Sequence, residues 1–319
     1  MKPPTRTALV TAFATIYLVW GSTYLGIRVA VETLPPFAMA AGRFLLAGGA
    51  LAAWIAATRG LRPTARQWRD NAIVGAFLLL GGNGLVAWAE QVIPSGIAAL
   101  VVGLQPLMMV LTEWAWPGGH RPTRATIAGL LVGFAGVAWL AAPWESAAAG
   151  GFDRTGVLVL VAASAFWAIG SIYGRHVRTP AEPFTASALQ MLGGGSALTV
   201  AALLHGDLAH LSIAAVSGRS WLAFAYLTAV GSLVGFSTFV YLMKHSVPAR
   251  VATYAYVNPI VAVILGWLIL GEPITTRTLA AAAAIVVSVA LITTQKARHP
   301  DPAAIARPGL GTAGAPGRT

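Results

Sequence analysis

Ten apolar windows of roughly 20 residues each occupy most of this chain, and no other feature restricts its fold so strongly. An α-helix of that length spans the hydrocarbon core of a bilayer, which is about 30 Å thick. Charged residues make up 10% of the 319 residues, whereas a soluble domain carries about a quarter, so the chain has too little polar surface for a water-facing globule. We therefore predict an all-α polytopic protein of about ten transmembrane helices, held in the lipid bilayer of a bacterial inner membrane. The predicted spans are residues 7–27, 36–57, 71–91, 96–116, 125–141, 155–175, 184–204, 219–243, 248–270 and 275–294.

The basic residues between the windows indicate which loops face the cytoplasm, because cytoplasmic loops carry an excess of Lys and Arg. With the N-terminus inside, the inside segments hold sixteen of the 21 basic residues, the outside segments hold four, and Arg43 lies within a window. The inside residues are Lys2, Arg6, Arg59, Arg62, Arg66, Arg69, Arg121, Arg124, Arg175, Arg178, Lys244, Arg250, Lys296, Arg298, Arg307 and Arg318; the outside residues are Arg28, Arg154, Arg219 and Arg277. Both termini are therefore predicted to be cytoplasmic. Basic residues scattered over short loops predict no nucleic-acid binding despite the net charge of +11.

The two ends of the chain need separate interpretations. Lys2 and Arg6 before an apolar run resemble a signal peptide, but the run is too long and no clear A-x-A cleavage site follows, so the first window is predicted to be retained. Residues 295–319, rich in Pro, Gly and Ala, show no period and are predicted to form a disordered cytoplasmic tail. The sequence has no cysteine, which excludes disulfides and thiolate metal sites.

Residues 7–141 and 155–294 resemble each other weakly, which suggests two repeats of five helices. The matching places are held by Trp20 and Trp167, by Trp88 and Tyr241, and by Gln105-Pro106 and Asn258-Pro259. Because each repeat has an odd number of spans, the second repeat must enter the membrane inverted. Inverted repeats place a binding site near the membrane midplane, and alternating access follows when one repeat rocks against the other.

Three stretches resemble EamA-type members of the drug/metabolite transporter superfamily, and the first two resemble its YedA-like branch. They are WGSTYLGIR (20–28) with ETLPPF (32–37) and GRF (42–44), WAEQVIPSGIAAL (88–100) with QPL (105–107), and NP (258–259) with LGEP (270–273). The resemblance covers residues 8–294 and implies ten helices in two EamA repeats, cytoplasmic termini, a central substrate cavity and efflux of amino acids or related metabolites. The family often ends the fourth helix of the first repeat with a Gly-Glu pair like Gly271-Glu272. Here Gly118-Gly119 stands in that place, which puts a role for an acidic residue there in doubt.

Charged residues inside the predicted spans are costly in lipid and need a partner, a cavity or a function. Arg43 lies roughly 10 Å into the second span, and Glu90 lies at similar depth at the outer end of the third. This match suggests a substrate site or gate, for instance a joint site for the carboxylate and ammonium of a zwitterion. A structural ion pair and outward snorkelling of Arg43 are the alternatives. Glu113, beside Trp114 and Trp116, is interpreted as an interfacial anchor, so Glu90 is the better candidate for a proton-coupling carboxylate.

Gln105 and Asn258 each precede a proline, which frees a backbone carbonyl about one turn earlier. In lipid such a carbonyl is tolerated where it faces a cavity or finds another partner, so the pair favours a shared cavity wall over a plain kink. Aromatic side chains at this depth can stack on a substrate or its ammonium group. The predicted cavity residues are Trp20, Ser22, Arg43, Trp88, Glu90, Gln105, Trp167, Gln190, Tyr241, Tyr254 and Asn258.

Sequence motifs that would define other functional classes do not occur. The six histidines and the aspartates fall in loops or at span ends, and neither an H-E-x-x-H helix nor a G-x-S-x-G turn is present, so we do not expect an enzyme. There is no P-loop motif for ATP hydrolysis. We predict a secondary transporter that exports or exchanges amino acids or related small polar metabolites by alternating access, without cofactor or metal. A channel or a non-transporting scaffold subunit is the alternative. The sequence does not decide the coupling ion, for which a proton is one candidate. It does not decide between a monomer and a homodimer either.

Overall fold

The computed structural model describes residues 5–60, 62–119, 121–141, 152–177, 180, 182–246, 251 and 253–298, and within these ranges its regular elements are helices. They are α1 (Arg6–Ala30), α2 (Pro36–Thr58), α3 (Ala65–Gly75), η1 (Ala76–Gly84), α4 (Leu85–Ala89), α5 (Ser95–Val102), α6 (Gln105–Ala115), α7 (Arg124–Ala141), α8 (Arg154–His176), α9 (Pro183–His205), α10 (Asp207–His210), η3 (Ile213–Ala215), α11 (Gly218–Tyr226), η4 (Leu227–Phe236), α12 (Ser237–His245), α14 (Tyr254–Leu270) and α15 (Thr276–Arg298). Helix α15 runs through residues 295–298, which were assigned to the tail on sequence grounds. The remainder of the predicted tail, residues 299–319, lies outside the described residues.

Seven helical segments are long and apolar enough to cross a membrane, by length and composition. These segments are Arg6–Ala30, Pro36–Thr58, Ala65–Ala89, Ser95–Ala115, Arg154–His176, Pro183–His205 and Gly218–His245. Three shorter apolar helices, Thr126–Leu140, Val257–Leu270 and Thr276–Ser288, fall in the remaining predicted windows. Large apolar side chains such as Leu204 and Leu222 are 85% and 73% exposed, as expected of a surface that faces lipid. The described chain is an all-helical polytopic membrane protein, and the crossing of all ten windows stays a prediction.

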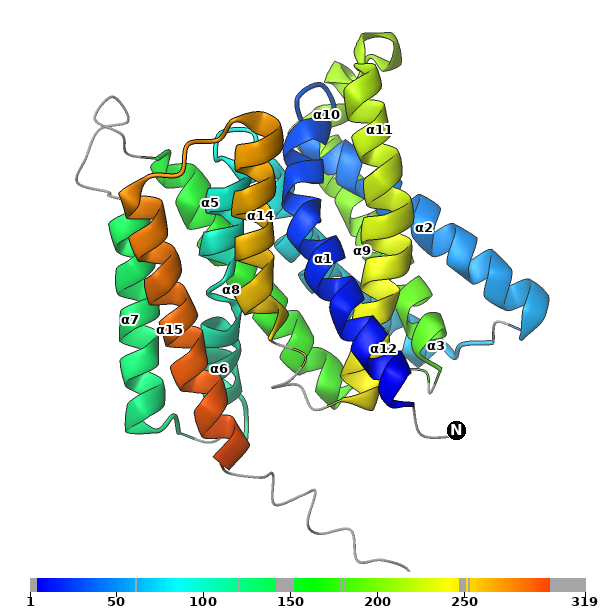
Figure 1. Cartoon of the computed structure of the whole chain (residues 1–319). Helices are drawn as coiled ribbons and strands as arrows, with labels where there is room; N and C mark the ends of the chain where they lie inside the picture. Colours follow the sequence, from blue (N-terminus) through cyan, green and yellow to red (C-terminus); the bar gives the residue numbers. More distant parts are fainter. Residues whose placement is uncertain are drawn as a thin grey trace, which may run out of the picture.

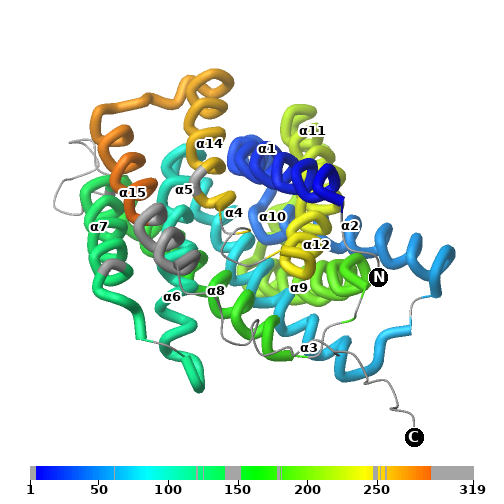
Figure 2. The backbone as a smooth tube through the Cα atoms, turned by 60° about the horizontal axis from the view of Figure 1, so that its bottom comes forward, coloured from blue at the N-terminus to red at the C-terminus, as the bar shows by residue number. Residues whose placement is uncertain are grey.

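Helices far apart in the sequence pack side by side in one bundle (Figure 1). Helix α2 packs along α9, α7 along α15, and α1 along α14. Helix α8 contacts η1 and α6, and α1 contacts α11 and η4. Figure 2 shows α7 and α15 together at one edge of the bundle and α2 at the opposite edge.

Two of the long spans contain a π-helical segment, η1 in Ala65–Ala89 and η4 in Gly218–His245. Such segments are rare and occur frequently at functional sites. Each contains a glycine against which a tryptophan from another helix packs. A Cβ atom added to Gly82 would lie 2.8 Å from the Trp167 ring, and one added to Gly235 would lie 2.8 Å from Nε1 of Trp20. Glycine is needed at both places because no side chain fits between the two helices.

The start of α2 is fixed by a carboxylate from the first residue of α10. Asp207 accepts hydrogen bonds from the backbone N–H groups of Phe37 (2.8 Å) and Ala38 (2.9 Å). These N–H groups have no partner within their own helix, and a negative charge is favourable at this end of the helix dipole. His205 contacts the other Asp207 oxygen at 2.6 Å.

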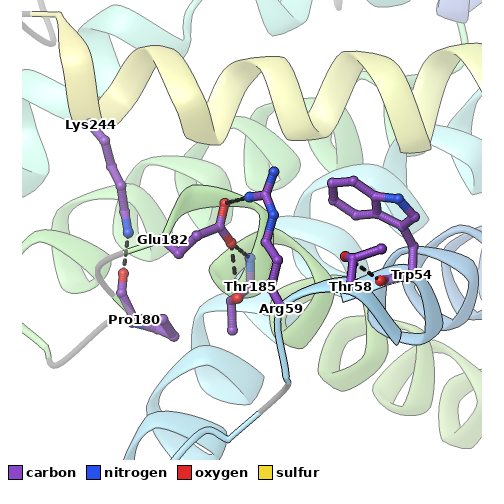
Figure 3. Close-up of polar contacts among 7 residues, drawn as sticks. All are labelled: Trp54, Thr58, Arg59, Pro180, Glu182, Thr185 and Lys244. Atoms are coloured by element: carbon purple, nitrogen blue, oxygen red, sulfur yellow. Dashed lines mark hydrogen bonds and ion pairs between the residues drawn. The ribbon is translucent and has the colours of Figure 1, made fainter. Parts of the chain in front are cut away.

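The start of α9 is fixed in turn beside the end of α2 (Figure 3). Glu182 accepts a hydrogen bond from the Thr185 N–H at 2.6 Å and forms a 3.4 Å ion pair with Arg59. Lys244, near the end of α12, donates to the carbonyl of Pro180. The α2–α9 pair is therefore tied at both ends, and α12 joins one of them.

A second carboxylate links distant helices at the start of α5. Glu272, just after α14, accepts hydrogen bonds from the N–H and the hydroxyl of Ser95, both at 2.8 Å, and from the N–H of Gly96 at 3.0 Å. Gly271 places it there by ending α14 with a left-handed φ of 66°, which glycine adopts without strain. Gly119 provides no such carboxylate in the first half.

Candidate substrate cavity

A central cavity lies where the two halves of the chain meet, and its volume is about 60 Å³, which is room for a few water molecules. Its polar lining residues are Thr23, Tyr24, Arg43, Asn83, Gln105 and Asn258, and its aromatic lining residues are Trp20, Phe44, Trp167, Phe236 and Tyr254. Both halves contribute, because these residues belong to α1, α2, η1, α6, α8, η4 and α14.

Helix α1 forms one wall through a regular stripe of side chains. Trp20, Thr23, Tyr24 and Ile27 all line the cavity. Residues spaced by three, four and seven positions lie on the same face of an α-helix. The opposite face of α1 turns away, and Ser22, a predicted cavity residue, bonds there to the Tyr226 hydroxyl at 2.5 Å.

Arg43 supplies the only charged side chain among the described lining residues. It is 3% exposed, and its guanidinium carbon lies 4.3 Å from the centre of the Phe44 ring. One terminal nitrogen donates to the side-chain carbonyl of Asn83. The Nε atom has no hydrogen-bond partner among the described residues. A buried cation with an unused donor is costly, so this group is suited to an anionic ligand.

Glu90 lies behind the cavity wall and is absent from its lining. It follows α4 and is fully buried, and neither carboxylate oxygen has a hydrogen-bond partner among the described residues. Its backbone carbonyl accepts a hydrogen bond from Arg28. Within the described structure no ion pair joins Glu90 to Arg43, because the guanidinium bonds to Asn83 instead. Arg43 therefore reaches the cavity, and Glu90 stands near it as an unpaired carboxyl group.

Gln105 on α6 and Asn258 on α14 both line the cavity. The hydroxyl of Tyr254 donates to the Gln105 side chain at 2.8 Å, which joins the two halves across the cavity. With its amide oriented so that the NH2 group donates, Asn258 bonds to the carbonyls of Tyr17 (3.1 Å) and Tyr254 (3.2 Å). Helix α5 ends at Val102 and α6 begins anew at Gln105, whereas Pro259 lies inside continuous α14.

An aromatic cluster closes the cavity toward the end of the bundle where α1 begins. Its members are Trp20, Trp167, Phe239 and Tyr254. The Trp20 ring centre lies 5.5 Å from that of Trp167, 4.9 Å from that of Phe239 and 5.1 Å from that of Tyr254. A smaller space, lined by Met109, Ser171 and Met243 among others, lies beyond it. Trp167 and Tyr254 line both spaces and therefore separate them.

Six predicted residues line the cavity, namely Trp20, Arg43, Gln105, Trp167, Tyr254 and Asn258, and five do not, namely Ser22, Trp88, Glu90, Gln190 and Tyr241. Trp88 packs against both parts of the apolar core. Gln190 donates to the Asn71 side chain at 3.0 Å between α9 and α3. Tyr241 stacks on His245 with ring centres 4.3 Å apart. Glu113, interpreted as an anchor, forms a 3.5 Å ion pair with Arg175 on α8.

Sequence reasoning missed Thr23, Tyr24, Asn83, Phe44 and Phe236 as lining residues. Helical spacing from Trp20 would have found Thr23 and Tyr24. Asn83 is the one polar side chain among the glycines of residues 81–84. Small residues of this kind are typical of close helix packing, so the sequence pattern alone does not indicate a cavity residue there. Among the described residues no three His, Asp or Glu side chains gather to hold a metal ion.

A helical membrane bundle around a cavity lined from two halves is the architecture of a small-molecule transporter. The chain belongs to the EamA-like transporter family, whose model matches residues 7–142 and again residues 154–294. The uncharacterized inner membrane transporter YedA of Escherichia coli K12 is 35% identical over 297 residues, covering 91% of this chain and 92% of YedA. The uncharacterized transporter YvbV of Bacillus subtilis is 28% identical, and the match covers 92% of this chain and 93% of YvbV. A solved crystal structure that carries no functional name aligns with a TM-score of 0.64 and 25% identity, covering 92% of this chain and 99% of the other.

These findings confirm the EamA and YedA-like resemblance. They identify a multi-pass inner-membrane transporter of the EamA type, whose partners are a small-molecule substrate and the lipid bilayer. The family and its named relatives point to transport rather than catalysis.

Proposed function

We propose that this chain is a secondary carrier that exports or exchanges amino acids or related small polar metabolites by alternating access. Its moving parts are two inverted five-helix repeats, residues 7–141 and 155–294, with both termini in the cytoplasm. The observation that carries this proposal is the central cavity, lined from both halves and closed toward one end by the aromatic cluster. A carrier needs a site that is shut on one side at a time, whereas a channel needs a continuous path.

The packing of the two halves supports the inverted repeat. Trp20 of the first half packs on Gly235 of the second, and Trp167 of the second packs on Gly82 of the first. Contacts between helices follow the same reciprocal pattern: α1 packs on α14 and α8 on α6, while α1 packs on η4 and α8 on η1. A two-fold relation between the repeats produces such pairs.

The starts of α7 and α15 repeat the same hydrogen bonds. The Thr126 N–H donates to the Thr123 hydroxyl at 3.2 Å, and the Thr278 N–H donates to the Thr275 hydroxyl at 3.1 Å. In each pair the two hydroxyl oxygens also lie close, at 2.9 Å and 3.0 Å. The start of α1 and the end of α15 lie at the same end of the bundle, the lower end in Figure 1, as two termini on one side of a membrane require.

Proton coupling through Glu90 forms part of this proposal. The carboxyl group is buried without a hydrogen-bond partner among the described residues, and Arg28 donates to the backbone carbonyl of the same residue. A buried carboxyl group without such a partner can change its proton occupancy when a charged substrate enters nearby. We expect wild-type transport to respond to an imposed pH gradient and Glu90→Gln transport to lose that response. This result would support Glu90 as the proton-coupling carboxyl group. An unchanged response in the variant would overturn it.

Counterflow in proteoliposomes tests the carrier assignment directly. Purified protein is reconstituted into vesicles loaded with pooled amino acids and other polar metabolites, and uptake of labelled members is followed. We expect saturable uptake that depends on an internal partner substrate. Gly231→Phe should abolish it because the new ring would fill the cavity, whereas Gly49→Phe, where nothing lies within 4 Å of an added Cβ, should retain it.

Flux that rises linearly with concentration and needs no internal substrate would favour a channel. No flux across the panel, with protein that is folded and correctly inserted, would favour a scaffold subunit. Size-exclusion chromatography with light scattering on the same preparation decides between monomer and homodimer.

A further inference from the structure

The charges around the cavity are unbalanced, and this points to the substrate's charge. Among the described lining residues there is one guanidinium, that of Arg43, and no carboxylate. The nearby Glu90 lies off the lining and forms no hydrogen bond to Arg43. A zwitterion would find a partner for its carboxylate but no carboxylate for its ammonium group.

The donors beside Arg43 are arranged for a carboxylate. Asn83 on η1 holds one terminal guanidinium nitrogen, and the unpaired Nε of Arg43 is buried. Tyr24 lines the same cavity from α1, whereas the hydroxyl of Thr23 donates to the carbonyl of Trp20 at 2.7 Å. Hydrogen bonds between a guanidinium and a carboxylate are among the strongest in proteins. A dianion would bring one negative charge that no lining cation matches.

The rest of the lining suits a flat apolar body. Trp20 and Trp167 meet edge to face, with planes at 88°, and Tyr254 meets Trp20 at 84°. Their rings, with Phe44 and Phe236, form the aromatic part of the lining. Aromatic rings favour offset or edge-to-face packing with another ring.

We infer that the cavity recognises organic monocarboxylates with a flat apolar body, and that the substrate needs no ammonium group. Arg43 binds the carboxylate, Asn83 positions Arg43, and the aromatic rings hold the body. This rests on the proposed carrier function and names the substrate class of the same cavity.

Three compounds with one phenyl body separate the charge requirements. These are 3-phenylpropanoate, which carries only a carboxylate, phenylalanine, which carries both groups, and phenethylamine, which carries only an ammonium. Counterflow of each is measured with the full-length chain in proteoliposomes at slightly alkaline pH, where the carboxylate is ionised. Protein-free vesicles give the passive leak to be subtracted. We expect 3-phenylpropanoate to exchange at least as fast as phenylalanine, and phenethylamine to stay at background.

Exchange of phenylalanine alone, or of phenethylamine, would overturn this inference and leave the carrier assignment standing. Absence of exchange for all three would overturn it as well. Saturable counterflow of other metabolites in the same vesicles would then show that the carrier assignment survives. Absence of any counterflow would overturn both the carrier assignment and the substrate class.

Variants of Arg43 test the anchor itself. Arg43→Gln should reduce 3-phenylpropanoate counterflow by about ten- to a hundredfold, since it removes charge-assisted hydrogen bonds. The counterflow rate of Arg43→Lys should fall between those of the wild type and Arg43→Gln, because lysine keeps the charge but loses the planar donor group. Arg66→Gln, at an exposed arginine on α3, is the matched control and should equal the wild type.

Thermal stabilisation by 3-phenylpropanoate is measured on each detergent-solubilised variant to separate binding from folding. A folded Arg43→Gln protein that is stabilised like the wild type, or that exchanges the carboxylate at the wild-type rate, would overturn the assignment. If Arg43→Gln does not fold, Arg43→Lys and the compound series still decide it.

Discussion

The two halves of this transporter build one framework but contribute different chemistry to the cavity. Each supplies a tryptophan, Trp20 or Trp167, and an amide before a proline, Gln105 or Asn258. The first half adds Arg43 and Asn83, whereas the second adds Phe236 and Tyr254. Repeated elements therefore set the shape of the cavity, and the unrepeated ones set what it can bind.

Residue spacing makes the difference specific. Arg43 follows Trp20 by as many residues as Gln190 follows Trp167, and Asn83 precedes Gln105 by as many as Phe236 precedes Asn258. Gln190 bonds to Asn71 away from the central cavity, and Phe236 is apolar. The cation and its positioning amide thus belong to one repeat only. A framework of two repeats can evolve an asymmetric site through changes at such matched positions.

The largest effect should come from the shared Trp–Gly contacts. Gly82→Leu and Gly235→Leu each place a side chain against Trp167 or Trp20, where even a Cβ atom would lie 2.8 Å away. Overpacking of this kind costs about 1–3 kcal/mol of folding stability. Thermal unfolding should show similar losses for both, and none for Gly49→Leu. A loss of thermal stability in only one of the two variants would contradict the equivalence of the two Trp–Gly contacts.

The Glu272 contact should matter next, and its carboxylate comes from the second half alone. Glu272→Ala removes three hydrogen bonds at the start of α5, and a side chain that caps a helix start contributes about 0.5–2 kcal/mol. We expect the melting temperature to fall clearly. The control is Glu32→Ala, whose 4.0 Å ion pair with Arg219 is exposed and is worth about 0–1 kcal/mol. Equal effects of the two changes would contradict the linking role of Glu272.

The polar difference at matched positions should appear in transport rather than in stability. Asn83→Leu removes the acceptor that holds Arg43, so counterflow should fall about tenfold, equivalent to roughly 1.4 kcal/mol. Phe236→Leu, at the matched place, should lower it by no more than about threefold, since both side chains are apolar. Initial rates at several substrate concentrations provide the comparison. A larger loss in Phe236→Leu would reverse the assignment of specificity to the first half.

The smallest effect is expected for the bond across the halves. Tyr254→Phe removes the hydroxyl that donates to Gln105, at a cost of about 1 kcal/mol. Tyr241→Phe, at a residue outside the cavity lining, is the control. Both the melting temperature and the rate of counterflow should change slightly in Tyr254→Phe. No change in either would show that the two halves are held without this bond.

Seven of the ten predicted windows correspond to helices long and apolar enough to cross a membrane, because apolar length alone determines which segments can enter lipid. It did not predict η1 and η4, since a π-helical segment leaves the hydropathy of a window unchanged. The face of a helix was harder to assign. Arg43 and Glu90 were predicted at similar depth, yet only Arg43 lines the cavity. Ser22, Gln190 and Tyr241 failed to reach it for the same reason, whereas Trp20 and Trp167 were found because a repeat marked them.

Alternating access of the cavity is the central claim, and thiol labelling tests it most directly. Since the chain has no cysteine, Thr23→Cys in the cavity and Met243→Cys beyond the aromatic cluster provide single reporters without background. Labelling by a membrane-impermeant maleimide is measured from each side of the membrane, with and without the compound that gives the fastest counterflow. The account predicts that Thr23→Cys is the more reactive site without substrate, and that substrate lowers its labelling while raising that of Met243→Cys from the other side. Simultaneous labelling of both sites, or no response to substrate at either, would contradict it.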